Sequence, residues 1–160
     1  MVAFKAKSRE LALRAFSGFI IGALILSAIY YGGRTWFLLA SIISLISLWE
    51  YYQLLSKKFR VSKGIGFLAG ILVLLASAEY LRPASILIIF TLTSFVLFMI
   101  EILRRQFSQV SYAIWNVGGT LSGLIYIILP WSYMVLLRAH PIGRTLLFSL
   151  FLCTWSCDIA

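Results

Sequence analysis

One acidic side chain stands near the end of a strongly apolar run: Asp158 follows Trp155 and Cys157 in the segment LFLCTWSCDIA. A carboxylate can hold a divalent cation, but an ionised carboxylate that faces lipid is costly. Asp158 is therefore expected to face a protein interior or a water-filled cavity, and it is the candidate functional-site residue. Interhelical hydrogen bonding, or snorkelling to the membrane surface, is the alternative role for this acid.

The two cysteines do not form a recognisable site. Cys153 and Cys157 are four residues apart, so a helix stacks them on one face, where they are poorly placed to bridge one another. Without histidine support they are too few for a zinc site, and we interpret them as small packing residues. The sequence also lacks a phosphate-binding glycine loop, paired histidines at metal spacing and a Ser/His/Asp set.

The composition places these residues in a membrane. The 160 residues are 62% hydrophobic and 12% charged, whereas soluble domains have about 25% charged residues. The mean hydropathy is +0.99. The net charge of +9 does not indicate nucleic-acid binding, because the Lys and Arg residues lie between apolar runs, where they act as topology signals. The expected fold class is all-α: a polytopic membrane helix bundle in a single domain.

About six membrane spans are predicted from the apolar runs and the breaks between them. Gly32 and Gly33 end the first span, and Arg82-Pro83 makes a tight connection between the third and the fourth. Pro130 is expected to kink the fifth span, and the polar segment 101–112 is expected to lie along the membrane interface. The predicted spans cover residues 15–31, 35–55, 64–81, 83–100, 115–137 and 145–160.

The sixth predicted span is short. Its 16 residues reach only about 24 Å, against a hydrocarbon core of about 30 Å. We therefore expect residues 1–160 to be the N-terminal transmembrane portion of one longer membrane-embedded enzyme domain, with the last helix truncated.

The distribution of positive charge predicts the orientation. Lys and Arg are concentrated in alternate connections, with ten on one side of the spans and four on the other. This asymmetry predicts a protein of the inner (cytoplasmic) membrane with its N-terminus in the cytoplasm. Asp158 then lies about 21 Å along its helix from Arg144, in the cytoplasmic half. The richer side carries Lys5, Lys7, Arg9, Arg14, Lys57, Lys58, Arg60, Lys63, Arg104 and Arg105, and the other carries Arg34, Arg82, Arg138 and Arg144.

Other polar and small residues have structural interpretations. Glu101 precedes Arg104 and Arg105 at helical spacing, and Glu79 precedes Arg82 in the same way, so both acids are expected to form interfacial ion pairs. Two small-xxx-small patterns predict close helix packing, without indicating whether the partner is in the same chain. These patterns are Gly66 with Gly70 and Gly119 with Gly123.

The run LLFSLFLCTWSCDIA resembles the CDP-diacylglycerol synthases (phosphatidate cytidylyltransferases), in which a tryptophan precedes an acid by three residues in an apolar helix. Trp155 and Asp158 match that pattern. The segment GGTLSGLIYIILPWSYMVLLR is similar to the glycine-containing helix of the family, and the opening of the first span at Arg14 and Ser17 and the close of the second with WEYYQL also match. Cys157 stands where the family often has serine, and the downstream Lys/Arg/Asp-rich motif of the family is absent.

The resemblance implies a reaction of CTP with phosphatidic acid that gives CDP-diacylglycerol and pyrophosphate, in phospholipid biosynthesis. It also implies Mg²⁺ as cofactor, with Asp158 as the catalytic residue and a ligand of the metal, and a homodimer in the lipid bilayer. Residues 1–160 alone are expected to be inactive. An ion-coupled secondary transporter, in which an intramembrane acid binds H⁺ or Na⁺, is one alternative. Others are a CTP-dependent polyprenol kinase and a scaffold subunit without chemistry.

Overall fold

The computed structural model describes residues 2–78, 83–107 and 112–159, and this part of the chain is helical without any strand. Helices α5, η1 and α6 follow one another without a break, so six helical rods correspond to the six predicted spans. The all-α prediction is confirmed. The elements are α1 (Val2–Tyr31), α2 (Gly33–Leu55), α3 (Lys63–Ala78), α4 (Pro83–Phe107), α5 (Ala113–Gly123), the π-helix η1 (Leu124–Ile128), α6 (Leu129–Ala139) and α7 (Gly143–Ile159).

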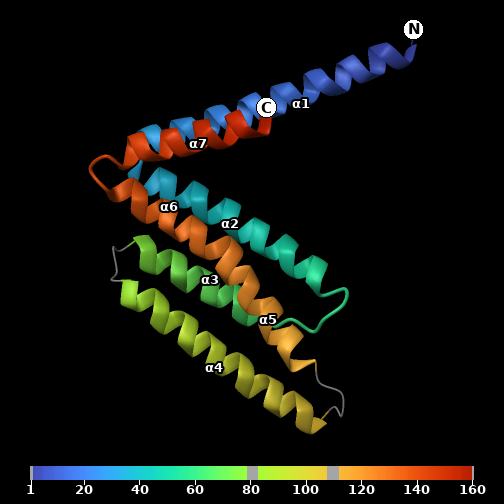
Figure 1. Ribbon diagram of the computed structural model, residues 1–160, viewed down its shortest axis with the longest axis vertical. Coiled ribbons are helices and arrows are strands. Elements are labelled where there is room, and N and C mark those ends of the chain that lie inside the picture. The colour runs from blue at the N-terminus through green and yellow to red at the C-terminus, as the bar shows by residue number, and fades with distance from the viewer. Residues whose placement is uncertain (1, 79–82, 108–111, 160) are drawn as a thin grey trace.

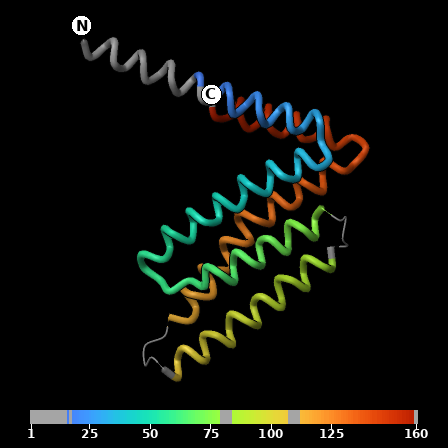
Figure 2. Tube along the Cα trace, turned by 180° about the vertical axis from the view of Figure 1, so that it is seen from behind, coloured from blue at the N-terminus to red at the C-terminus, as the bar shows by residue number. Residues whose placement is uncertain are grey.

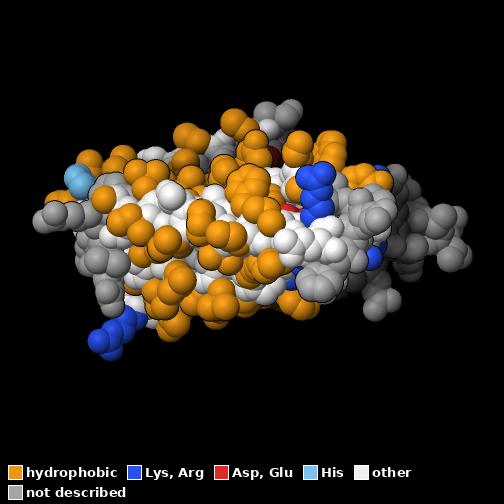
Figure 3. Space-filling view, turned by 90° about the horizontal axis from the view of Figure 1, so that it is seen from below, with side chains coloured by type: hydrophobic (Ala, Val, Ile, Leu, Met, Phe, Trp, Pro, Cys, Tyr) orange, Lys and Arg blue, Asp and Glu red, His pale blue; other side chains and the backbone are white. Residues whose placement is uncertain are grey.

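Several of these helices are suited to a bilayer. Within the described residues, three are long and apolar enough to cross a membrane: Gly33–Leu55, Ala84–Gln106 and Ala113–Ala139. Two shorter apolar helices, Gly18–Tyr31 and Lys63–Ala78, accompany them. Hydrophobic side chains cover most of the described surface in Figure 3, as expected for a protein whose solvent is lipid. The membrane-bundle prediction is therefore confirmed.

Two predicted boundaries differ from the structure. The fourth span does not stop at Ile100, because α4 continues to Phe107. The prediction of an interfacial linker over 101–112 was therefore wrong for its first half. The physical reason is that Glu101 is buried and pairs with Arg104 one turn later, which stabilises the added helical turns. The first helix likewise begins at Val2, so the polar head of the chain extends the first span as helix.

The fifth span runs through Pro130 without ending. Proline lacks the backbone N–H that an α-helix needs and crowds the preceding turn. The chain responds with the π-helix Leu124–Ile128 directly before Pro130, and the Leu129 N–H bonds to the Leu124 carbonyl five residues back. Where a kink was expected at Pro130, the structure has a widened π-helical turn within one continuous helical rod.

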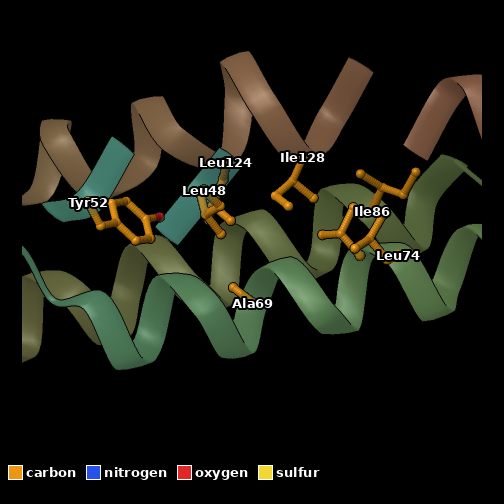
Figure 4. Packing of buried hydrophobic residues seen from close by; sticks show 8 residues of the cluster. Leu48, Tyr52, Ala69, Leu74, Ile86, Leu124 and Ile128 are labelled. Atoms are coloured by element: carbon orange, nitrogen blue, oxygen red, sulfur yellow. The ribbon is translucent and has the colours of Figure 1, made fainter. Parts of the chain in front are cut away.

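The helices form two groups (Figures 1 and 2). Helices α2, α3, α4 and the α5–η1–α6 rod pack into a bundle, whereas α1 and α7 lie side by side, antiparallel, and diverge from that bundle. The first group has its own apolar core, part of which is shown in Figure 4. This core contains Leu48, Tyr52, Ala69, Val73, Leu74, Ile86, Leu124 and Ile128.

A second, smaller core joins the two groups where α1 turns into α2 and α6 turns into α7. It contains Ile29, Trp36 and Leu147, with Ala28, Ala40 and Val135. Only Gly32 separates α1 from α2, and its φ of 65° is in the left-handed region that favours glycine. A side chain at Gly32 would also collide with the guanidinium of Arg138, which donates to the Ile29 carbonyl at 2.8 Å.

The glycine pairs pack within this chain. A Cβ at Gly123 would lie 2.8 Å from Tyr52 Cε1, and one at Gly70 would lie 3.2 Å from Leu48 Cδ2. Gly66 also faces the Tyr52 ring. Helices α3 and α5 therefore both approach the same face of α2, and Gly70 also faces Ile128 of η1. The prediction of close packing is confirmed, and the partners lie in the same chain.

Candidate functional site

Asp158 lies in the last turn of α7, and its side chain is exposed. Helix α7 starts at Gly143 and runs antiparallel to α1, alongside it (Figure 1). Within the described residues, Asp158 has neither a hydrogen bond nor an ion pair. The carboxylate is therefore available to an external ligand.

An apolar hollow of about 590 Å³ lies between α1 and α7, with Asp158 at its lining. The α1 side is built from small and apolar residues, and Trp155 forms the α7 side next to the acid. Because Gly18, Gly22 and Ala23 have little or no side chain, α1 leaves this space open. Its lining residues are Gly18, Phe19, Gly22, Ala23, Leu26, Trp155 and Asp158.

A row of aromatic rings fixes the acid-bearing turn. Trp36 of α2 meets Phe151 edge to face, with ring centroids 6.3 Å apart, and Phe151 lies 6.1 Å from Trp155. Trp155 in turn packs against α1 at Gly22, where an added Cβ would lie 3.1 Å from Trp155 Cη2. Because Trp155 and Asp158 are three residues apart, they share one face of α7, and the rings orient the face that carries the carboxylate.

The donor set for a metal ion is small in the described part of the chain. Groups of three or more His, Cys, Asp or Glu that could hold an ion are absent from it. Asp158 supplies a hard oxygen ligand, and Mg²⁺ commonly takes only one or two carboxylates together with substrate phosphates and water. The carboxylate present is of the type that Mg²⁺ prefers.

The cysteines are both free and exposed on α7. They therefore do not pack inside the described chain, contrary to the prediction that they are packing residues. An exposed thiol beside lipid is compatible with the apolar exterior of this helix.

A second acid, Glu101, is buried instead of exposed. Its side chain is only 5% exposed, and its Oε1 accepts hydrogen bonds from Arg104 at 2.8 Å and from the Asn116 amide at 3.1 Å. The predicted ion pair with Arg104 is confirmed, but the burial was not expected. The sequence signal that could have revealed the contact is Asn116, a polar amide in an otherwise apolar span. The expected pair of Glu79 and Arg82 lies outside the described residues.

The family of the chain follows from comparison with known proteins. A model of the cytidylyltransferase family matches residues 12–160, a range that contains both the apolar hollow and Asp158. The chain belongs to the cytidylyltransferase family. No curated protein and no solved structure matches it.

Membership of the cytidylyltransferase family confirms the resemblance found from Trp155 and Asp158. It supports a CTP-using transferase activity in general, of the nucleotidyltransferase type. Among the alternatives raised by the sequence, it favours CTP-dependent chemistry over an ion-coupled transporter.

Proposed function

We propose that the protein is a phosphatidate cytidylyltransferase of the cytoplasmic membrane, which uses CTP and phosphatidic acid to make CDP-diacylglycerol. The observation that carries this proposal is the position of Asp158, an exposed carboxylate without a partner among the described residues, at the lining of an apolar hollow. Family membership supplies the CTP-dependent chemistry. A lipid substrate needs both an apolar environment for its acyl chains and polar groups for its phosphate, and this arrangement supports both.

In the proposed reaction, a phosphate oxygen of phosphatidic acid attacks the α-phosphorus of CTP. A new P–O bond forms, the bond between the α-phosphorus and the bridging oxygen breaks, and pyrophosphate leaves. Both substrates are polyanions, so most of the catalytic task is positioning and charge stabilisation. Asp158 would hold Mg²⁺, which when bound supplies charge neutralisation for the phosphates.

The residues of this chain would contribute position. Trp155 and Phe151 hold the last turns of α7 against Gly22 and Trp36, so that the carboxylate stays beside the hollow. The apolar walls would retain the acyl chains and keep bulk water from the lipid side. A homodimer and an orientation with the N-terminus in the cytoplasm are parts of the same proposal, and the second rests on the charge count.

Isotope transfer tests the reaction directly. The full-length protein is incubated with phosphatidic acid, Mg²⁺ and CTP labelled at either the α- or the γ-phosphate. We expect only the α-label to enter the lipid, with release of pyrophosphate in equal amount. Entry of the γ-label would indicate a kinase such as a polyprenol kinase, and the absence of lipid labelling from either position would refute both.

A further inference from the structure

The loop between α2 and α3, residues 56–62, is basic and its backbone is fixed by other helices. The Arg60 N–H donates to Asn116 Oδ1 at 2.9 Å, and the Arg60 carbonyl accepts from the Arg104 guanidinium at 2.8 Å. The Ser62 N–H donates to Thr120 Oγ1 at 3.2 Å. Asn116 of α5 thus binds the backbone N–H of Arg60, and Arg104 of α4 binds its carbonyl, so that the backbone of the loop is fixed at this residue.

Buried groups support this bracing. The carboxylate of Glu101 lies beneath the loop and orients both Arg104 and Asn116, whose other groups contact Arg60. Phe59 stacks on Trp115 with parallel rings, 5.4 Å between centroids and 5° between planes. Burying a carboxylate is unfavourable unless it is well paired, so its presence here indicates that a fixed loop geometry is maintained at some cost.

The bracing places the basic loop against the end of α4, which carries further cations. Lys57, Lys58 and Arg60 of the loop are exposed, and so is Arg105 at the end of α4. In the described part of the chain, none of these four side chains has a hydrogen-bond or ion-pair partner. We call these four residues the basic patch. Membrane topology requires only that cations lie on one side of the bilayer, and it does not require that the loop carrying them be braced by two other helices.

A hollow of about 520 Å³ adjoins the patch, between α4 and α5. Arg105 and the rings of Tyr112 and Trp115 line it, together with Phe98 and Ile102, which are exposed to the bilayer. The buried Glu101 carboxylate also lines it, with its charge compensated by the Arg104 guanidinium. Figure 3 shows the same combination: a cationic side chain and a small carboxylate area at one end of a largely hydrophobic face. Tyr and Trp side chains are typical of the headgroup level of a membrane.

From this juxtaposition we propose a binding site for an anionic diacyl phospholipid, distinct from the Asp158 site. Its phosphate lies among the cations of the basic patch, and an acyl chain follows the apolar side chains of Phe98 and Ile102 along α4. A soluble polyphosphate would satisfy the cations and leave this apolar wall unused, so the geometry favours a lipid. The leaflet is the one that the charge count assigns to the cytoplasm. The proposal does not depend on the cytidylyltransferase reaction.

Lipid selectivity tests the site without any turnover. The full-length protein is reconstituted in phosphatidylcholine, and nitroxide-labelled phosphatidylglycerol, phosphatidic acid and phosphatidylcholine are added as separate probes. The motionally restricted fraction of each probe is measured by electron paramagnetic resonance. We expect phosphatidylglycerol and phosphatidic acid both to associate about threefold or more better than phosphatidylcholine, since each interfacial cation contributes attraction to anionic lipid.

The variant Arg60→Gln/Arg105→Gln should abolish most of this preference. Its matched control, Arg34→Gln/Arg144→Gln, removes the same net charge at the opposite end of the bundle and should retain it. If the first variant does not fold, Lys57→Gln/Lys58→Gln replaces it, because the two lysine side chains have no described contact. Equal loss in variant and control, preference for phosphatidic acid alone, or displacement of phosphatidylglycerol by millimolar tripolyphosphate would each overturn the proposal.

Discussion

Glu101 and Asp158, two of the five acidic residues of this chain, differ in the physical properties that decide what a carboxylate can do. Glu101, between α4 and α5, is buried and hydrogen-bonded to Arg104 and Asn116, and its network fixes a loop. Asp158, on the α7 helix that diverges from the bundle, is exposed beside an apolar hollow. A fully paired acid contributes to structure, whereas an accessible acid with free lone pairs can receive a ligand. Accessibility to a ligand, more than depth in an apolar segment, distinguishes the functional candidate.

The largest expected effect is on catalysis at Asp158. The change Asp158→Asn keeps the size of the side chain but removes the charge, so a metal ligand is lost while the fold is retained. We expect the full-length protein to insert normally and to lose about 10²-fold or more in kcat. The measurement is α-labelled CTP transfer to phosphatidic acid over a range of Mg²⁺ concentrations.

The matched control is Glu79→Gln, the same carboxylate-to-amide change at the residue that follows α3. It should leave turnover nearly unchanged, because the charge count puts that end of the bundle on the side away from CTP. Near-normal turnover and Mg²⁺ dependence in Asp158→Asn would make this acid structural and remove the distinction between the two carboxylates.

The second expected effect is on stability at Glu101. The change Glu101→Ala leaves Asn116 and Arg104 without their shared acceptor and should lower the free energy of unfolding by about 2 kcal/mol. Unfolding in mixed micelles, followed by circular dichroism, measures it. Asp158→Ala should change the same quantity by less than about 0.5 kcal/mol, because that side chain is exposed. Equal destabilisation by the two changes would contradict the assignment of separate roles.

A smaller effect is expected from the glycines that bring α5 against α2. The change Gly123→Ala places a Cβ 2.8 Å from the Tyr52 ring and 3.0 Å from Leu48 Cδ1, so it should destabilise the bundle by about 1–2 kcal/mol. Gly118→Ala in the same helix is the control, because its Cβ meets nothing within 4 Å. Alanine should be neutral or slightly stabilising there, owing to its higher helix propensity. Unfolding in mixed micelles measures the free energy of unfolding of both variants. Similar free energies for the two would be inconsistent with close packing at Gly123.

The smallest effect is expected at Cys157, which precedes Asp158 on α7. Since its thiol is exposed and free, Cys157→Ser should change neither stability nor turnover by more than about twofold. This substitution introduces serine, the residue that the CDP-diacylglycerol synthases often have at this position. A large gain in turnover would indicate that a hydroxyl takes part in the site next to Asp158.

The approximate boundaries of most helices could be predicted from local sequence, whereas the role of Asp158 stays a prediction. Apolar run length and the breaks at Gly32 and Pro83 are enough to locate membrane helices, because the bilayer imposes a fixed length and full internal hydrogen bonding. The exceptions were the start of α1 at Val2 and the end of α4, where Glu101 was interpreted as interfacial. Its partner Asn116 is supplied by another helix, and a pattern within one segment does not show such a contact.

Composition and apolar runs in the sequence were enough to predict an all-helical membrane bundle, and they made Asp158 the candidate site residue, a role that stays a prediction. These properties depend on composition and on residues close together in the chain. Only the fold shows that Glu101 is paired with Arg104 beneath a braced loop, that α1 and α7 enclose an apolar hollow at Asp158, and that Arg104 of α4 contacts the loop at Arg60. The reason is physical: burial and pairing depend on which helices meet, and those contacts join residues far apart in sequence.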